Sequence, residues 1–235
     1  GRIANTPVAA EQLVRGWPAT AARPILVSSL PSYVGLHDPD ETRAVTRARL
    51  GLGDEDRLVL FAGQLRRYKH IESLITAFKD AESTFLNLVI AGPPADERYV
   101  RELRTMTQHM DRVQLIAQFL PNSELGNLLQ ACDLLVLPLE DALNSSSVLL
   151  GMSYEARVLA PQTATNYELQ RKYPGSGLSL YDPPLTPTDL LTALRDSSPR
   201  PRVAAGLPTF TGVAADQLTF FRDLRERGSL PQSGA

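Results

Sequence analysis

The sequence has very few of the residues that build metal centres and disulfides. It contains one cysteine, Cys132, and three histidines, His37, His70 and His109, which lie far apart. A single cysteine excludes a disulfide framework and a thiolate metal site. No two histidines show the close helical spacing that pairs of metal ligands usually have. We therefore expect no bound metal, and we expect Cys132 to be a small buried apolar group.

The sequence also lacks long apolar runs and an excess of basic residues, since 24 lysines and arginines stand against 26 aspartates and glutamates. No run approaches the roughly 20 residues needed to span a bilayer. No secretory signal is visible, although the chain opens on Gly1 where a complete translation product would open on methionine. The net charge is −2, which gives no support for nucleic-acid binding, since that would need a basic face. The sequence predicts a cytoplasmic protein with no nucleic-acid partner, present here as a piece of something longer.

Short apolar runs alternate with segments of helical spacing through most of the chain. Parallel neighbouring strands need a crossover helix, so this alternation predicts an α/β fold with a doubly wound, Rossmann-like parallel sheet. Such sheets bind ligands at the carboxyl ends of their strands, where the strand order reverses. The expected strands are 58–63, 86–91, 113–116, 134–139, 158–160 and 178–180, and the expected helices between them include 40–50, 71–81, 97–109, 123–131, a helix from Val148, 166–172 and 187–195.

Composition divides the chain into four expected parts. Residues 1–39 hold a helix that starts at Thr6-Pro7, a short strand and a linker rich in turn-forming residues. Residues 40–196 form the parallel sheet and its helices. Residues 197–227 are a proline-rich connection followed by an amphipathic helix that can dock through Leu218, Phe221 and Leu224. Residues 228–235 are a disordered tail.

A cluster of cations follows the first strand of this sheet. The strand at 58–63 ends in the segment GQLRRYK, residues 63–69. Gly63 allows a ligand to approach the backbone closely, and Arg66 and Lys69 supply a forked guanidinium and a compact ammonium that suit a diphosphate. The plain alternative is a basic loop that is only solvated.

A second anion-friendly element stands before the helix that starts near Val148. Asn144, Ser145, Ser146 and Ser147 are good helix-capping residues. The free N–H groups and positive dipole end of such a helix start favour phosphate. An ordinary capped helix is the alternative. If both elements face one crevice, they form a diphosphate site.

Other possible ligand-binding residues have weaker support in the sequence. Gly92-Pro93-Pro94 and residues 113–118 could border a nucleotide base, and Glu140 and Asp141 could meet sugar hydroxyls. Turns and solvated loop acids explain them equally well. There is no phosphate-binding GxxxxGK[ST] loop, no GxSxG elbow and no GxGxxG fingerprint.

Four segments in order resemble the C-terminal domain of the group 1 family of GT-B glycosyltransferases. They are RLGLGDEDRLVLFAGQLRRYKHIESLITAF (49–78), LNLVIAGPP (86–94), LPNSELGNLLQACDLLVLP (120–138) and NSSSVLLGMSYEARVLAP (144–161). A subgroup of bacterial polysaccharide enzymes similar to β-mannosyltransferases is the nearest, because it carries comparable arginine–tyrosine–lysine and asparagine–serine segments.

The resemblance implies a hexosyltransferase of polysaccharide biosynthesis that binds a UDP- or GDP-linked sugar and needs no metal or other cofactor. Gly63, Arg66 and Lys69 would hold the diphosphate, with Arg66 and Lys69 catalytic, and Asn144, Ser145, Ser146 and Ser147 would bind the donor at the helix start. Residues 1–39 would be the end of an N-terminal domain that binds a glycan or small-molecule acceptor. That domain is otherwise missing, so the chain would be an incomplete catalytic unit, and contact with a membrane surface through it is left open.

The chain departs from the family pattern at several positions. The family's pair of glutamates falls on Ala142 and Leu150, its arginine after the first glycine is Gln64, and its glycine after the lysine is His70. The second glutamate normally holds the donor ribose. These departures support an alternative from another class, a degenerate domain that binds nucleotide sugar weakly or serves as an interaction module. The sugar, the base, the acceptor and the stereochemical outcome are left open.

Overall fold

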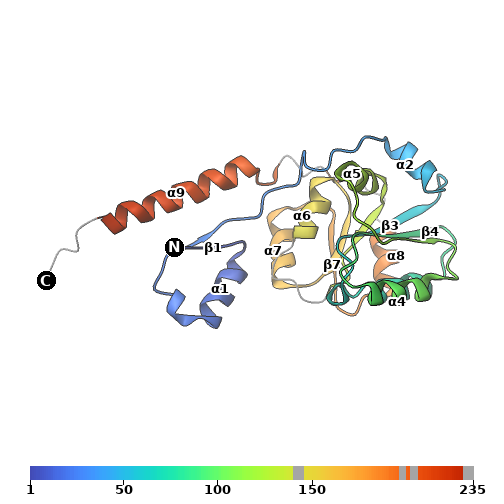
Figure 1. The fold of residues 1–235 in the computed structure, drawn as a ribbon, viewed down its shortest axis with the longest axis horizontal. Coiled ribbons are helices and arrows are strands. Elements are labelled where there is room, and N and C mark those ends of the chain that lie inside the picture. Colours follow the sequence, from blue (N-terminus) through green and yellow to red (C-terminus); the bar gives the residue numbers. More distant parts are fainter. Residues whose placement is uncertain (140–145, 196–199, 202–205, 230–235) are drawn as a thin grey trace. The chain divides into compact units, whose positions relative to one another are not determined.

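The computed structural model describes residues 1–139, 146–195, 200–201 and 206–229 (Figure 1). The chain divides into two compact units, a larger one of residues 33–205 and a smaller one of residues 1–32 with 206–235. The boundaries expected at residues 39, 196 and 227 remain predictions.

The larger unit is built on a six-stranded sheet whose paired strands are all parallel, in the order β5-β4-β3-β6-β7-β8. The chain passes from β3 outward to β5 on one side and from β6 outward to β8 on the other. This is the doubly wound topology that the sequence predicts, and the prediction is confirmed. The strands are β3 (Arg57–Ala62), β4 (Leu86–Ala91), β5 (Val113–Ile116), β6 (Leu134–Val136), β7 (Val158–Pro161) and β8 (Leu178–Tyr181).

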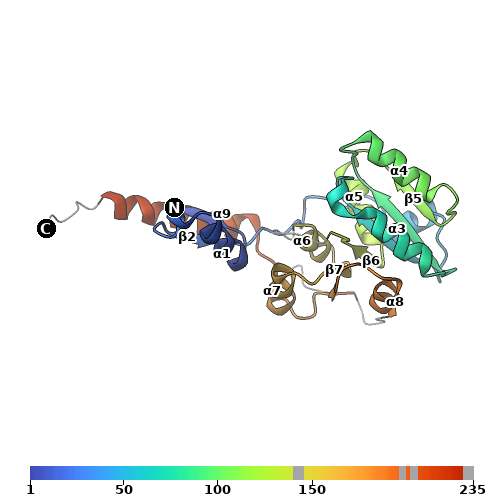
Figure 2. The same ribbon diagram turned by 90° about the horizontal axis from the view of Figure 1, so that it is seen from below.

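Helices cover both faces of this sheet. Helices α3 and α4 lie side by side (Figure 2) and share one buried cluster with α8, while α5 contacts β3 and α2 packs on α5. The helices of the larger unit are α2 (Arg43–Arg49), α3 (Ile71–Asp80), α4 (Glu97–Thr107), α5 (Asn122–Ala131), α6 (Ser146–Ser153), α7 (Ala164–Lys172) and α8 (Pro187–Arg195), with a short 3-10 turn, η2 (Arg67–Lys69).

The apolar runs in the sequence follow from burial on both faces. Val59 and Phe61 of β3 belong to the cluster shared with α3, α4 and α8. Leu58 and Leu60 alternate with them, so they point to the opposite face, and they are also fully buried. Strands buried on both faces read as continuous apolar runs rather than as alternating ones. Each such leucine contributes about 1.5–3 kcal/mol through burial.

The first helix of the larger unit starts later than the sequence predicts. The helix expected from Asp40 begins at Arg43, after the cap residue Thr42, whose side chain accepts a hydrogen bond from Val45 N at 3.3 Å. The N–H groups of Asp40 and its neighbour Glu41 instead donate to the side chain of the buried Asn127, each at 3.1 Å. The expected start is therefore wrong by three residues, because Thr42 has extended backbone angles (φ −77°, ψ 157°) and is itself the N-cap.

The smaller unit contains a βαβ segment. Strands β1 (Arg2–Ala4) and β2 (Ile25–Val27) pair in parallel, and the chain between them forms α1 (Pro7–Gly16) and the turn η1 (Pro18–Thr20). Thr6 caps α1 as the sequence predicts, since its hydroxyl accepts a hydrogen bond from Ala9 N at 3.0 Å.

A long C-terminal helix, α9 (Phe210–Ser229), belongs to the same unit. Ser32 N donates to Pro208 O at 2.7 Å, which joins the two stretches of chain that make up the unit. Helix α9 runs two residues into the range expected as a tail, and residues 230–235 lie outside the described part of the chain. Leu218 and Phe221 remain 63% and 49% exposed. Across the described residues, no helix combines the length and apolar character needed to cross a bilayer.

Candidate functional site

The strand order reverses between β3 and β6, which is where open α/β sheets usually bind ligands. The chain leaves β3 toward β4 on one side, whereas β6 leads toward β7 on the other, so these two central neighbours mark the point where the order reverses. In open α/β sheets the loops after such strands diverge and leave a crevice at their carboxyl ends. The loop after β3 carries the cations, and the chain after β6 leads to α6. Both elements predicted from the sequence therefore follow neighbouring strands at this point.

Glycines end both β3 and β4. Gly63 and Gly92 have φ values of 148° and 149°, which disfavour residues with side chains. A Cβ on Gly92 would lie 2.0 Å from the carbonyl oxygen of Gly63, so only glycine allows the two strand ends to come this close. A Cβ on Gly63, in contrast, would meet no atom within 4 Å. Among the described residues, nothing therefore obstructs the backbone at Gly63 on this side, and its role in ligand binding remains a prediction.

Residues 63–70, hereafter the cation loop, are tied to the loop after β4. Leu65 is fully buried, its N–H donates to Pro93 O at 2.9 Å, and its carbonyl accepts from Ala95 N at 3.2 Å. The loop then turns through η2 and ends at His70, which has left-handed backbone angles (φ 50°, ψ 41°). The family resemblance places a glycine at this position, and glycine adopts these left-handed backbone angles without strain.

The three cations of the loop are not equivalent. Arg67 is paired with Glu102, whose carboxylate oxygens both lie 2.7 Å from its Nη2, and this carboxylate raises the pKa of Arg67. Arg66 is exposed and Lys69 is half-buried. Through their side chains these two form no ion pair or hydrogen bond with the described residues, and Lys69 Nζ lies 5.2 Å from the ring centroid of Tyr68. Arg66 and Lys69 are therefore the cations left to bind an anion.

Helix α6 begins at Ser146, and its first residues, Ser146 and Ser147, are half-buried. A helix start leaves four N–H groups without intrahelical partners and carries the positive end of the helix dipole. Asn144 and Ser145, the other two predicted residues of this element, lie outside the described residues, as do Ala142, Glu140 and Asp141. Leu150, the position of the family's second glutamate, is a half-buried residue of α6.

One residue at this edge of the sheet was not singled out from the sequence. Phe119 lies three residues beyond the end of β5 and is 75% exposed. An exposed aromatic ring near the carboxyl ends of the strands is suited to stacking on a planar base. Its signal in the sequence is an aromatic residue in a segment that belongs to neither a strand nor a helix. Residues 113–116, expected to border a base, are the strand β5 itself.

Metal and thiol chemistry find no support in the residues that the structure describes. Among these residues, no group of three or more histidine, cysteine, aspartate or glutamate side chains could hold a metal ion. Burial raises the pKa of the Cys132 thiol to about 11, so the thiol is protonated near neutral pH and weakly reactive. Its burial agrees with the expectation from the sequence.

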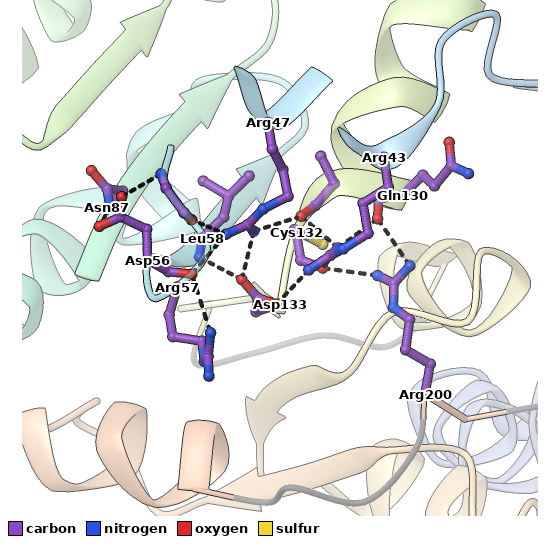
Figure 3. Close-up of polar contacts among 12 residues, drawn as sticks. Arg43, Arg47, Asp56, Arg57, Leu58, Asn87, Gln130, Cys132, Asp133 and Arg200 are labelled. Atoms are coloured by element: carbon purple, nitrogen blue, oxygen red, sulfur yellow. Dashed lines mark hydrogen bonds and ion pairs between the residues drawn. The ribbon is translucent and has the colours of Figure 1, made fainter. Parts of the chain in front are cut away.

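A second group of arginines lies at the opposite, amino edge of the sheet (Figure 3). Arg43 and Arg47 both pair with Asp133, at 2.6 and 3.0 Å. Arg43 and Arg200 also donate to the last carbonyls of α5, at 2.6–3.4 Å. Burial lowers the pKa of Arg200, and the carbonyl oxygens around its guanidinium replace water. These donors are already used, so this cluster supports the fold rather than a ligand.

Comparison with known proteins relates about half of the chain to glycosyltransferases. The family "Glycosyl transferases group 1" matches residues 42–153. A GDP-mannose:glycolipid 4-beta-D-mannosyltransferase from Xanthomonas campestris pv. campestris is 28% identical over 124 residues, which are 53% of this chain and 36% of that protein. The aligned region thus spans about a third of the relative's length.

Solved structures share the fold over nearly the whole chain. Sucrose-phosphate synthase from Thermosynechococcus elongatus has a TM-score of 0.72 at 20% identity, covering 96% of this chain and 58% of that one. The Anabaena protein HepE, crystallised with UDP and glucose, has a TM-score of 0.73 at 17% identity, covering 95% of this chain and 62% of that one. At these identities the likeness establishes the fold.

Proposed function

We propose, from the premise that residues 42–153 are a glycosyltransferase group 1 domain, that this chain carries the donor site of a hexosyltransferase. The donor is a nucleotide-diphosphate sugar, and the acceptor is a glycan or a small molecule. The cation loop and the start of α6 hold the diphosphate between them and take the place of a metal ion.

One observation carries this proposal. Arg66 and Lys69 have no ion-pair or side-chain hydrogen-bond partner among the described residues, and they follow β3, the strand that neighbours β6 at the reversal point. Two unpaired cations on one side of a crevice and a helix start on the other match the charge of a diphosphate. When the sugar–phosphate bond breaks, negative charge develops on this leaving group, and fixed cations stabilise it. Arg66 and Lys69 would therefore act in catalysis as well as in binding.

We expect the base of the donor to be guanine. The sequence relative from Xanthomonas campestris pv. campestris acts, by its name, on GDP-mannose, whereas the structural neighbour HepE was crystallised with UDP at only 17% identity. The exposed ring of Phe119 provides a surface on which a purine can stack.

The acceptor is expected to bind to a further domain, as the family resemblance implies. By its name, the Xanthomonas relative acts on a glycolipid, which would bring such a domain to a membrane surface. Synthesis of a polysaccharide or glycolipid from a nucleotide sugar in the cytoplasm is the biological role that fits this proposal.

Calorimetric titration with GDP, GMP, UDP and UMP tests the donor site. We expect one diphosphate to bind at least about tenfold more tightly than its monophosphate, as charge-assisted bonds of about 1.5–3 kcal/mol to the second phosphate require. Arg66→Ala and Lys69→Ala should each weaken diphosphate binding by roughly 10- to 150-fold. Lys79→Ala, at an exposed position of α3, is the matched control and should leave binding unchanged. Equal binding of diphosphate by the parent and both site variants would refute the proposal.

A degenerate domain is the second candidate, and Leu150 is the observation that favours it. This residue of α6 is apolar where the family carries the glutamate that holds the ribose. Failure of the chain to bind any of the four nucleotides would favour this alternative.

A further inference from the structure

Tyr99 of α4 contacts both ends of the turn that carries the two unpaired cations. Its ring lies beneath Arg67, whose guanidinium carbon is 4.9 Å from the ring centroid. Its hydroxyl donates a short hydrogen bond to Glu72, in the first turn of α3. The two contact points are therefore Arg67 and Glu72. Lys69 lies between them in the sequence, and Arg66 directly precedes the first. Tyr99 therefore connects helix α4 to both the start and the end of the segment 66–72.

The hydroxyl of Tyr99 needs its partner. The side chain is only 2% exposed and belongs to the buried cluster between the sheet and helices α3, α4 and α8. A buried hydroxyl without a hydrogen bond is costly, so the bond to Glu72 fixes the first turn of α3 against α4. Burial and this bond raise the pKa of Tyr99, which keeps the hydroxyl protonated as a donor near neutral pH.

Arg67 completes the connection from the other side. Its guanidinium is held between the Tyr99 ring and Glu102, one turn further along α4. Arg67 also lowers the pKa of Glu102, so the carboxylate remains charged near neutral pH. The contact points Arg67 and Glu72 lie on either side of His70, whose left-handed backbone reverses the chain. Two contacts with α4 thus fix a turn that otherwise depends on a strained residue.

We infer that Tyr99, Arg67 and Glu102 are positioning residues of the diphosphate site, which hold the cation loop so that Arg66 and Lys69 are preorganised to receive the second phosphate. This inference rests on the proposed function. A preorganised loop does not lose further conformational freedom when the ligand binds, and a displacement of about 1 Å at the site is enough to weaken its effect strongly. Release of the loop should therefore weaken the bonds to the second phosphate and leave the contacts of the nucleoside unchanged.

The ratio of diphosphate to monophosphate affinity measures this role. Glu102→Gln removes the partner of Arg67 at a position whose side chain is 42% exposed, so folding should be affected little. We expect the ratio to fall about three- to tenfold, with monophosphate affinity unchanged within about twofold. Tyr99→Phe should lower the ratio similarly by releasing Glu72. Glu97→Gln, on the exposed first turn of the same helix, is the matched control and should leave the ratio unchanged.

The same variants exclude a direct role for Arg67. If Arg67 itself contacted the phosphates, Glu102→Gln would free it and would leave the affinity unchanged or raise it. A fall after Glu102→Gln therefore supports positioning, whereas no change or a rise overturns it. If the parent prefers the diphosphate and Arg66→Ala removes that preference while Glu102→Gln and Tyr99→Phe keep it, this inference alone is wrong. If the parent shows no preference, the proposed function is wrong, and the inference is overturned with it.

Discussion

Replacement of Asp133 by asparagine should destabilise the larger unit strongly. The carboxylate of Asp133 accepts hydrogen bonds from Arg43 Nη2 at 2.6 Å through Oδ1, and from Arg47 Nη1 at 3.0 Å and Leu58 N at 2.8 Å through Oδ2 (Figure 3). Its side chain is 18% exposed. An asparagine keeps the volume but places an NH₂ group against one of these donors, and it leaves two guanidinium groups without their counter-charge.

The expected fall in the free energy of unfolding follows from the number of hydrogen bonds that Asp133→Asn removes or weakens. One charge-assisted bond is lost, at about 1.5–3 kcal/mol, and the remaining bonds lose about half their strength because their acceptor becomes neutral. Arg43 is 33% exposed, so water compensates part of the loss. We expect the free energy of unfolding to fall by about 2–3 kcal/mol, which corresponds to a decrease in Tm of roughly 5–10 °C for a unit of this size.

The assay has to report on the larger unit alone. The only tryptophan of the sequence, Trp17, lies in the smaller unit, so its fluorescence is the wrong probe. Hydrogen exchange of the buried amides of β3, Leu58 among them, followed at increasing urea concentration, measures the effect on the larger unit directly. Asp54→Asn is the control, because Asp54 is exposed and should shift stability by less than about 0.5 kcal/mol. A shift this small for Asp133→Asn would refute the reasoning.

Two further predictions concern acid stability and backbone strain. The N–H of Gly53, and then Arg112, hold the pKa of Asp56 below its ordinary value of 3.8. Asp56 therefore contributes stability above that pH which is lost as the pH falls through its lower folded pKa. In thermal melts between about pH 5 and about pH 2.5, the deficit of Asp56→Asn should shrink toward the acid end, and a constant deficit would contradict this. At His70 the left-handed backbone costs about 1–2 kcal/mol, and glycine removes this cost but loses about 0.5–1 kcal/mol more entropy on folding. His70→Gly should therefore raise the free energy of unfolding by up to about 1 kcal/mol, whereas a lower urea midpoint than the parent's would show that the His70 side chain contributes to stability.

The sheet was predictable from the sequence because its strands are buried on both faces. Runs such as Leu58–Ala62 and Leu86–Ala91 contain almost no polar residue, and that pattern requires coverage by helices on each side. Helix starts were predictable where the cap is local, as at Thr6. The start near Asp40 was predicted three residues too early although its cap, Thr42, is also local, because the sequence offers several capping residues close together, Asp38, Asp40 and Thr42. Nothing in the sequence around Arg200 predicts its bonds to the carbonyls at the end of α5, about 70 residues earlier.

The candidate site was likewise predictable from the sequence only in part. The sequence predicts that Gly63 and a group of cations follow β3, since both are contiguous with the strand. It does not show which cation is already paired, because Glu102 lies 35 residues beyond Arg67. The roles of Arg66 and Lys69 remain predictions, and the structure adds that they, unlike Arg67, form no ion pair with the described residues.

The two edges of the sheet use their arginines differently, and this difference supports the assignment of the site. At the amino edge, Arg43, Arg47 and Arg200 direct their N–H groups to carbonyl oxygens and to Asp133, so their charge is used within the protein. At the carboxyl edge Arg67 and Arg98 both pair with Glu102, whereas Arg66 and Lys69 of the same loop have no ion pair with the described residues. Cations held close together without a counter-charge repel one another, and an anion that binds between them removes that repulsion. These two cations follow β3, one of the two strands between which the strand order reverses, and both features support our proposal that an anion binds beside Gly63.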